Sequence, residues 1–337
     1  MMTEYDSSIV LSSRVRLARN LKDIPFRARF TQDQADDCIQ QVLNALRNEP
    51  VPYRYLPMRG VNAIKRQSLV EDHRISPDLF KTDDRGAALI RDDDKVVIMV
   101  NEEDHLRIQS FSDGLSLKEA AATAFETEDS LGRHLSFAFD RDWGYLTACP
   151  TNTGTGMRAS VMMHLPMLTL RKSMGQVMQL AAKLGLTMRG MYGEGSEALG
   201  HVYQLSNQVT LGKTEEELLE SVGATAAQIA EMELDLRRKA LEEDAVEWQD
   251  QFNRSLGLML YARKMPMKEF YSHWSDLRLA SGMGLLPVSV KRLDNLLSIS
   301  QDAHLMEKAG HDLTGRELEV RRATLIREKL TDWLRAE

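Results

Sequence analysis

The sequence changes character after Thr214, and this change constrains the fold more than any other feature. Before Thr214, short apolar runs alternate with segments of helical periodicity. From Glu215 onward the pattern is almost wholly helical, with Gly and Pro residues as punctuation. A chain of 337 residues is long enough for about two domains. We therefore expect a mixed first part, residues 1–245, and a helical second part, residues 246–337, with a loose boundary near residues 240–250.

The first part combines hairpins with helices. Thr31 and Gln34 have the spacing of a capping box before apolar residues at helical spacing, which predicts a helix over residues 31–48. Two apolar runs flank three consecutive aspartates, which predicts a hairpin over residues 87–100. The other expected elements are strands at residues 106–111, 145–148, 159–165 and 202–206 and helices at residues 117–134 and 176–184. This order predicts an α+β fold with a largely antiparallel sheet flanked by helices, followed by an all-helical C-terminal domain.

Composition disfavours several classes of protein. The formal net charge of −7 argues against a chain that coats nucleic acid through phosphate contacts. The two cysteines, Cys38 and Cys149, lie far apart, and no Cys/His cluster has metal-ligand spacing, which fits a reducing cytosol. The first ten residues lack the basic and apolar regions of a signal peptide, and no membrane-length apolar stretch follows. We expect a cytoplasmic enzyme with no membrane segment and no direct contact with nucleic acid.

Two charged segments are candidates for a functional site. In residues 12–20, Arg14 and Arg16 alternate with apolar residues, so on a strand they share one face. A solvated basic edge strand explains the same pattern. In residues 101–107, three consecutive acids and Arg107 follow an apolar strand, which suits a substrate cleft but is also typical of a polar loop.

Two glycine-containing segments complete the set. Residues 149–160 form a Gly/Thr loop that leads to Arg158 and match neither a Walker A loop nor a dinucleotide fingerprint. Residues 189–196 contain three glycines, which permit a tightly turning loop that closes over a substrate.

Together the four segments resemble the signature of the phosphagen kinases, the creatine and arginine kinase superfamily. The most specific strings are Asn-Glu-Glu-Asp-His-Leu-Arg at residues 101–107 and Cys-Pro-Thr-Asn-x-Gly-Thr-Gly-x-Arg-Ala-Ser at residues 149–160, and the resemblance covers residues 9–212. Kinases of small guanidines carry a helical domain before the catalytic one. Here the signature begins at Ile9 and the helical part follows it, an arrangement that resembles the bacterial protein-arginine kinases of the heat-shock system.

The resemblance implies a site for ATP. It places the phosphates against Arg14, Arg16, Arg107, Arg158 and Arg189, and His73 near the base, although a lone histidine is more often structural. The positions that it matches to nucleotide binding are Ser12, Ser13, Arg14, Val15, Arg16, His73, Arg107, Arg158, Ala159, Ser160, Val161, Met162, Arg189, Gly190, Met191, Tyr192, Gly193 and Glu194. Magnesium is expected to arrive with ATP, held mainly by phosphate oxygens and water, with Glu102 in an outer shell and no dedicated protein site.

The resemblance also implies catalytic residues. Glu103 and Glu194 match the two acids that hold the guanidinium, and Glu103 is expected to act as general base. Cys149 matches a cysteine close to the substrate, where nearby arginines would favour a thiolate. A buried, inert thiol is the alternative. Cys38 lies on the apolar face of a predicted helix, and we expect it only to pack.

Two expectations concern the C-terminal domain. Its many apolar side chains exceed what a small helical domain easily buries, which predicts a homodimer. They are Leu256, Leu260, Phe270, Trp274, Leu277, Leu285, Leu293, Leu296 and Leu297. By resemblance, this domain also carries a phosphoarginine pocket around Arg-Asp-x-x-Arg-Ala. Here Leu318 and Glu319 replace its first two residues while Arg322 and Ala323 are kept, which predicts weak binding of phosphoarginine.

Partners follow from the resemblance alone. They are protein substrates that present arginine, a repressor of heat-shock genes, an activator protein with metal-binding cysteines, and an unfoldase-protease complex that degrades marked proteins. Three other functions remain open at this point: a kinase for a free guanidine such as arginine, a catalytically inactive scaffold, and a nucleic-acid-binding regulator.

Overall fold

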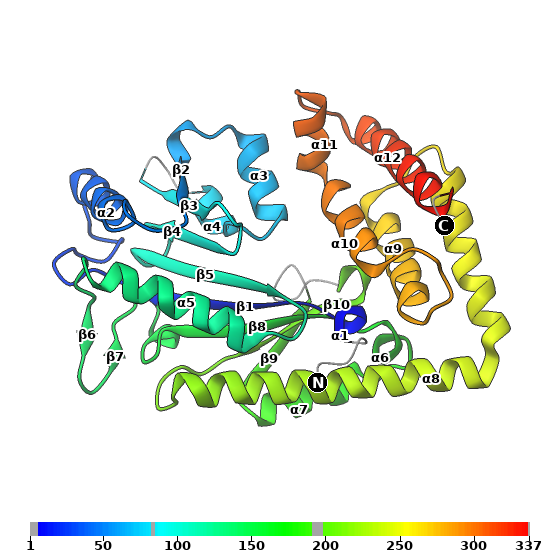
Figure 1. Cartoon of the computed structure of the whole chain (residues 1–337), viewed down its shortest axis with the longest axis horizontal. Helices are drawn as coiled ribbons and strands as arrows, with labels where there is room; N and C mark the ends of the chain where they lie inside the picture. Colours follow the sequence, from blue (N-terminus) through cyan, green and yellow to red (C-terminus); the bar gives the residue numbers. More distant parts are fainter. Residues whose placement is uncertain (1–5, 82–84, 191–197, 336–337) are drawn as a thin grey trace.

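The computed structural model describes residues 6–81, 85–190 and 198–335. A sheet with its covering helices forms one part of the molecule, and helices α9 to α12 form the other (Figure 1). Helix α8 (Glu215–Tyr261) runs along the first part and then turns to join the second. The remaining helices are α1 (Asp6–Ile9), α2 (Gln32–Ala45), α3 (Ala63–Glu71), α4 (Pro77–Lys81), α5 (Leu117–Gly132), α6 (Pro166–Leu170), α7 (Met174–Lys183), α9 (Met267–Gly282), α10 (Val290–Ile299), α11 (Asp302–Ala309) and α12 (Gly315–Arg335).

The main sheet has eight strands in the order β2-β3-β4-β5-β1-β8-β10-β9, and every neighbouring pair is antiparallel. This confirms the predicted fold class. The strands are β1 (Val10–Arg19), β2 (Tyr53–Pro57), β3 (Ala87–Arg91), β4 (Val96–Val100), β5 (Leu106–Asp113), β8 (Met157–His164), β9 (Leu186–Gly190) and β10 (Val202–Asn207). A separate hairpin pairs β6 (Phe139–Asp140) with β7 (Gly144–Tyr145).

Strand β1 lies in the middle of the sheet, and this position decides between two interpretations of its arginines. It pairs with β5 on one side and β8 on the other. The edge-strand alternative is therefore wrong. Val15 and Leu17 are fully buried under α5, so Arg14 and Arg16 face the opposite side of the sheet.

Local sequence signals predicted several of the individual elements. The capping box is present, because Thr31 Oγ1 accepts the Gln34 N–H and Gln34 Oε1 accepts the Thr31 N–H. The hairpin of β3 and β4 forms as expected. Cys38 is fully buried in α2, which confirms its packing role, and burial raises the pKa of its thiol to about 12.

One predicted strand is wrong over most of its length. We expected a strand over residues 145–148, but regular pairing in the β6–β7 hairpin ends at Tyr145. Thr147 instead donates its hydroxyl to the Cys149 carbonyl at 2.8 Å, which closes a turn before Pro150. Side-chain hydrogen bonds of this kind compete with strand pairing. Strands β2, β6 and β9 and helices α1, α3, α4 and α6 were not predicted.

Helix α8 breaks at Asp244, whose φ of −158° and ψ of 82° are not helical. The Asp244 carboxylate accepts the Glu247 N–H at 3.0 Å, so it caps the second half of the helix. The helices that follow pack around Trp274, and Val202 of β10 belongs to the same apolar cluster. The core of the C-terminal part thus continues into the sheet.

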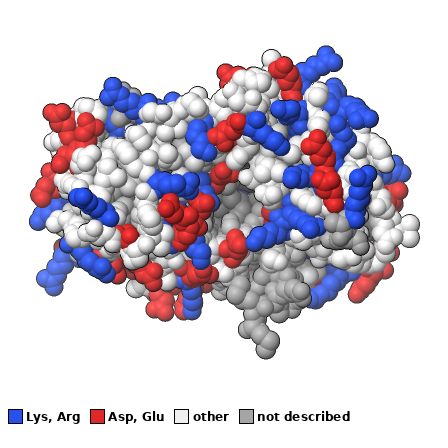
Figure 2. Space-filling view, turned by 45° about the horizontal axis from the view of Figure 1, so that its top comes forward, with Lys and Arg blue, Asp and Glu red and all other residues white. Residues whose placement is uncertain are grey.

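Most of the apolar side chains from which we predicted a homodimer are not available at the surface. Six of the nine residues, namely Phe270, Trp274, Leu277, Leu293, Leu296 and Leu297, are buried within the chain itself. Figure 2 shows one face of the molecule, on which basic and acidic side chains are interspersed. No helix within the described residues is long and apolar enough to cross a membrane.

A buried ion pair fastens α8 to its neighbours. The Glu233 carboxylate lies 2.9 Å from Nε of Arg237, and both side chains are almost completely buried. Glu233 also accepts the backbone N–H groups of Met167 and Leu168 at the start of α6. Arg237 donates to the carbonyl of Ser8 in α1. Both charges lie on α8 and pair with each other, and their further hydrogen bonds go to α6 and α1, so the pair makes the packing of these three helices mutually dependent.

Replacing Glu233 by Met leaves the Arg237 guanidinium buried without its counter-charge. We expect the free energy of unfolding to fall by about 3–5 kcal/mol, measured by denaturant unfolding. The double variant Glu233→Met/Arg237→Met removes both charges and should lose clearly less than the two single variants added together. Additive losses would show that the two side chains act independently.

Candidate active site

Arginines from four strands converge on one face of the sheet. Arg16 of β1 lies directly opposite Arg158 of β8, and Arg14 lies one pleat further along the same face. Arg107 comes from β5, opposite Ala18. Arg189 of β9 lies opposite Gln204, whose Oε1 accepts a hydrogen bond from Arg14 at 3.0 Å. The antiparallel register therefore brings together side chains that are far apart in the sequence.

The crowding of these guanidinium groups has an electrostatic cost. Burial, together with the charges of Arg158 and Arg107, lowers the pKa of Arg14 to about 10. Burial and the same neighbours, with Arg14, hold the pKa of Arg16 well below its ordinary value. Arg16 donates no hydrogen bond to any residue that the structure describes. A bound polyanion would relieve this repulsion, so the cluster is suited to phosphate groups.

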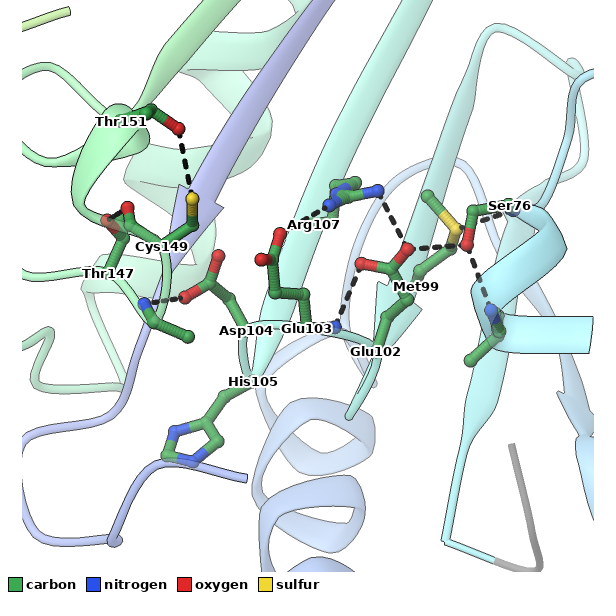
Figure 3. Close-up of polar contacts among 12 residues, drawn as sticks. Ser76, Met99, Glu102, Glu103, Asp104, His105, Arg107, Thr147, Cys149 and Thr151 are labelled. Atoms are coloured by element: carbon green, nitrogen blue, oxygen red, sulfur yellow. Dashed lines mark hydrogen bonds and ion pairs between the residues drawn. The ribbon is translucent and has the colours of Figure 1, made fainter. Parts of the chain in front are cut away.

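Three consecutive acids beside the cluster point in different directions (Figure 3). Glu102 is fully buried and accepts hydrogen bonds from Ser76 and from Arg107 Nη1, the latter at 2.8 Å. Asp104 turns the other way, and its Oδ1 accepts the Ala148 N–H and the Asn20 side chain, each at 2.7 Å. Glu103 lies between them with its side chain 44% exposed. Glu102 therefore holds an arginine, Asp104 holds a loop, and Glu103 remains accessible.

Glu103 is the acid that faces the open site. Its Oε2 lies 3.3 Å from Arg107 Nη2. Burial raises the pKa of its carboxyl group, and Arg107 offsets part of that effect. A carboxylate with a raised pKa accepts a proton more readily than an ordinary glutamate.

The loop that bears Cys149 closes this side of the site. Cys149 is partly exposed, with its Sγ 3.0 Å from Thr151 Oγ1, so the buried-thiol alternative is wrong. Together with Arg16, Glu103, Arg107 and Arg158 it lines a cavity of about 260 Å³. Gly156, with a φ of 61°, lets the loop approach β1, because a Cβ there would meet the Ala18 carbonyl at 2.7 Å.

Sequence comparisons agree with this geometry. Residues 34–236 match the family described as ATP:guanido phosphotransferase, C-terminal catalytic domain, and residues 245–337 match the protein-arginine kinase McsB C-terminal domain. A protein-arginine kinase from Caldanaerobacter subterraneus is 41% identical over 98% of this chain and 99% of its own length. One from Brevibacillus brevis is 43% identical over 96% and 92%.

The chain belongs to the protein-arginine kinase family.

Solved structures show the same fold in this family's wider relatives. Lombricine kinase superposes with a TM-score of 0.63 at 23% identity, over 69% of this chain and 68% of its own. The duplicated taurocyamine kinase from Schistosoma mansoni, solved with transition-state analogue components, gives a TM-score of 0.63 at 25% identity, over 80% of this chain and 40% of its own. The sheet and its arginines thus lie in a phosphagen-kinase fold.

A second cavity adjoins the arginines. It measures about 110 Å³ and is lined by Ser12, Arg14, Asp72, His73, Phe111, Ser160, Met162 and Gln204. His73 has a φ of 57°, and burial together with Arg14 lowers its pKa to about 4, so its ring is neutral at pH 7. The cavity provides room for an uncharged part of a ligand whose charged part binds the arginines.

Several positions matched to nucleotide binding do not present their side chains to this face. Ser13, Val15, Ala159 and Val161 are buried on the opposite face of the sheet. Met191, Tyr192, Gly193 and Glu194 lie outside the described residues, as Gly190 ends β9.

The altered motif in the C-terminal part is occupied by structural contacts. Arg322 is 1% exposed and donates to the carbonyls of Ser300 and Met265 and to Asp302. Leu318 packs in a small apolar cluster with Leu325. The guanidinium that the motif retains is therefore committed within the chain.

Sequence reasoning missed the residues that hold the site together. Asp104 lies in the acidic segment at residues 101–107, and Ser76 follows His73 by three positions, but nothing in the sequence indicates which group each one binds. Glu102 was expected near magnesium, whereas both its oxygens accept hydrogen bonds from Ser76, Arg107 and the Glu103 N–H. A run of three acids after a strand signals a site, and only the fold separates their roles.

Replacing Arg16 by Met keeps a long side chain but removes one of the crowded charges. We expect the free energy of unfolding without nucleotide to rise by about 1 kcal/mol, while most of the stabilisation by ATP is lost. Thermal melts with and without ATP measure both effects. Arg238→Met, at an exposed position on α8, is the control. It should change neither the free energy of unfolding nor the stabilisation by ATP by more than about 0.5 kcal/mol. A variant less stable than the parent would contradict the crowding argument.

Proposed function

We propose that this protein transfers the γ-phosphoryl group of ATP to arginine side chains of other proteins. The observation that carries the proposal is the arginine cluster facing an accessible glutamate, Glu103, across one cavity. The relatives named above as protein-arginine kinases support the same activity. Phosphoryl transfer needs alignment and charge neutralisation more than covalent chemistry, and the cluster provides both.

The reaction assigns each group a place. Arg14, Arg16, Arg107 and Arg158 bind the phosphate oxygens, with Arg189 beside them, and Mg²⁺ arrives on the nucleotide. A guanidinium is protonated at neutral pH and is a poor nucleophile, so its proton must leave. Glu103 accepts that proton while the guanidine nitrogen forms the bond to the γ-phosphorus and the bond to the β,γ-bridging oxygen breaks, releasing ADP. We assign the second acid of the acceptor site to Glu194.

Two features of the chain help Glu103 and the acceptor. The buried Glu102 carboxylate holds the Arg107 guanidinium in place, and from this position Arg107 also contacts Glu103. Cys149 lies at the mouth of the same cavity and contributes a polarisable group near the guanidinium. The raised pKa of Glu103 means that its basic form is lost at a higher pH than for an ordinary glutamate, so the rate should decline as the pH falls through that value.

A protein acceptor fits the surroundings of Glu103 better than a free guanidine does. Glu103 also borders an open cavity of about 500 Å³, lined by Phe26, Arg27, Ala28, Arg85 and Ala148. This space can receive the polypeptide that carries the acceptor arginine. A kinase for free arginine is the second candidate, and its substrate would leave this space unfilled.

The test compares acceptors and one variant. With ATP, we expect phosphate on arginine of an unfolded protein, mapped by mass spectrometry, and little on free arginine. Glu103→Gln keeps the shape of the side chain but cannot take the proton, so the rate should fall by about 10²- to 10⁴-fold. ADP affinity, measured by calorimetry, should stay near that of the parent. Faster transfer to free arginine, or an active Glu103→Gln variant, would contradict the proposal.

The wider role remains a proposal that rests on the family resemblance. We propose that phosphorylation marks proteins for a cytosolic unfoldase-protease complex, acts on a repressor of heat-shock genes, and is promoted by an activator protein with metal-binding cysteines. We also propose a homodimer, which light scattering at micromolar concentration would measure, although few of the side chains first expected at its interface are available.

Phosphoarginine should bind the C-terminal part only weakly. Leu318 replaces an arginine of the motif, and the Arg322 guanidinium is already hydrogen-bonded within the chain. Each charge-assisted hydrogen bond that is lost weakens binding by about 1.5–3 kcal/mol. We expect calorimetric titration of phosphoarginine into the full chain to show no micromolar site apart from the catalytic one. The same titration of the Glu103→Gln variant identifies the catalytic site, because only binding at that site should change. A second micromolar site would overturn this expectation.

A further inference from the structure

A third cavity lies where the two parts of the chain meet, next to His73. It measures about 200 Å³, and its walls come from Leu11, His73 and Met162 of the first part and Leu297, Ser298 and Gln301 of the second. It shares Ser12, Asp72, His73 and Met162 with the cavity beside Arg14. The two cavities are therefore neighbours with common walls. The C-terminal helices complete the wall of the 200 Å³ cavity.

The direction of a bound nucleotide follows from the positions of the charges. The γ-phosphoryl group must face Glu103, so the triphosphate lies along Arg107, Arg16 and Arg158. Arg14 belongs to the next cavity, together with the neutral His73. The rest of the nucleotide consequently extends past Arg14, and its base lies at the end where the C-terminal helices meet the sheet.

The C-terminal helices are held against this end by several polar contacts. Glu71, the last residue of α3, accepts the Ala303 N–H at 3.1 Å with both carboxylate oxygens, at the start of α11. Asp72 accepts hydrogen bonds from Ser298 Oγ at 2.9 Å and from His304 Nε2 at 3.0 Å. An anion at a helix N-terminus is favourable. These contacts fix α10 and α11 beside the residue that precedes His73.

Gln301 is a polar residue of the second part that lines this cavity and makes a single side-chain hydrogen bond to the described residues. It stands at the N-cap of α11, but its side chain caps no backbone group and turns into the protein, where it is 7% exposed. Its Nε2 donates to the Tyr271 hydroxyl at 2.8 Å. Its Oε1 accepts no hydrogen bond from the described residues. This oxygen is not one of the fully buried atoms that lack a partner, and Gln301 lines the cavity, so the oxygen is free to accept a hydrogen bond from a ligand there.

We propose that Gln301 recognises the nucleotide base, so that the C-terminal helices complete the base-binding site of the catalytic part. The Gln301 amide oxygen accepts a hydrogen bond from the 6-amino group of adenine, and Leu297 and Met162 contact the base from opposite parts of the chain. This inference rests on the proposed function only in assuming a bound adenine nucleotide. It makes Gln301 a specificity-determining residue that the catalytic motifs do not include.

The test measures ADP binding, which needs no phosphoryl acceptor and so is independent of the activity assay. Gln301→Met keeps the length of the side chain but neither donates nor accepts. We expect ADP to bind the full-length variant about threefold to tenfold more weakly, by calorimetry. The diphosphate of purine riboside, which lacks the 6-amino group, should bind parent and variant equally. Gln251→Met is the matched control: Gln251 bonds Asp276 elsewhere in the C-terminal part, and both ligands should bind it as they bind the parent.

Equal weakening of both ligands by Gln301→Met would overturn the proposal, because it would show a general distortion of the cavity. Unchanged ADP binding would overturn it as well. Thermal melting shows whether the variant is folded. If Gln301→Met does not fold, Gln301→Glu, which keeps an acceptor, replaces it: retained discrimination between the two ligands supports the proposal, and lost discrimination contradicts it.

Discussion

The site depends on holding several like charges close together. Guanidinium groups on neighbouring strands repel one another, and burial makes that repulsion stronger because water screens it less. A loop could not keep them in place, since it would move to separate them. A central strand that is hydrogen-bonded on both sides can, because moving Arg14 or Arg16 would break the sheet. The crowding is thus stored in the fold and released when a polyanion binds.

The three consecutive acids show how the chain limits that repulsion without neutralising the site. One carboxylate, Glu102, is buried and fixes Arg107 from behind. The next, Glu103, stays accessible to an acceptor, and Asp104 fastens the loop that carries Cys149. Adjacent residues leave the end of a strand in different directions, so neighbours in sequence obtain separate environments. Burial separates a structural carboxylate from an accessible one.

The C-terminal helices are more than an appendage. The buried Glu233–Arg237 pair ties α8 to α1 and α6, and Val202 of the sheet belongs to the helical core. Glu71 and Asp72 bind α10 and α11 beside the cavities that His73 lines. These polar contacts join the two parts of the chain beside His73.

The sequence by itself determined the elements whose signals are local. The capping box of α2, the β3–β4 hairpin and the helical C-terminal part follow from residues close together in the chain, and the motifs located the arginines and acids. Only the tertiary structure decided that β1 is central, that Glu102 is buried while Glu103 is exposed, and that Gln301 lines the same cavity as His73. These facts depend on pairings between residues many positions apart, such as Arg16 with Arg158. Local periodicity carries no information about such pairings, because the free energy of packing distant segments selects them.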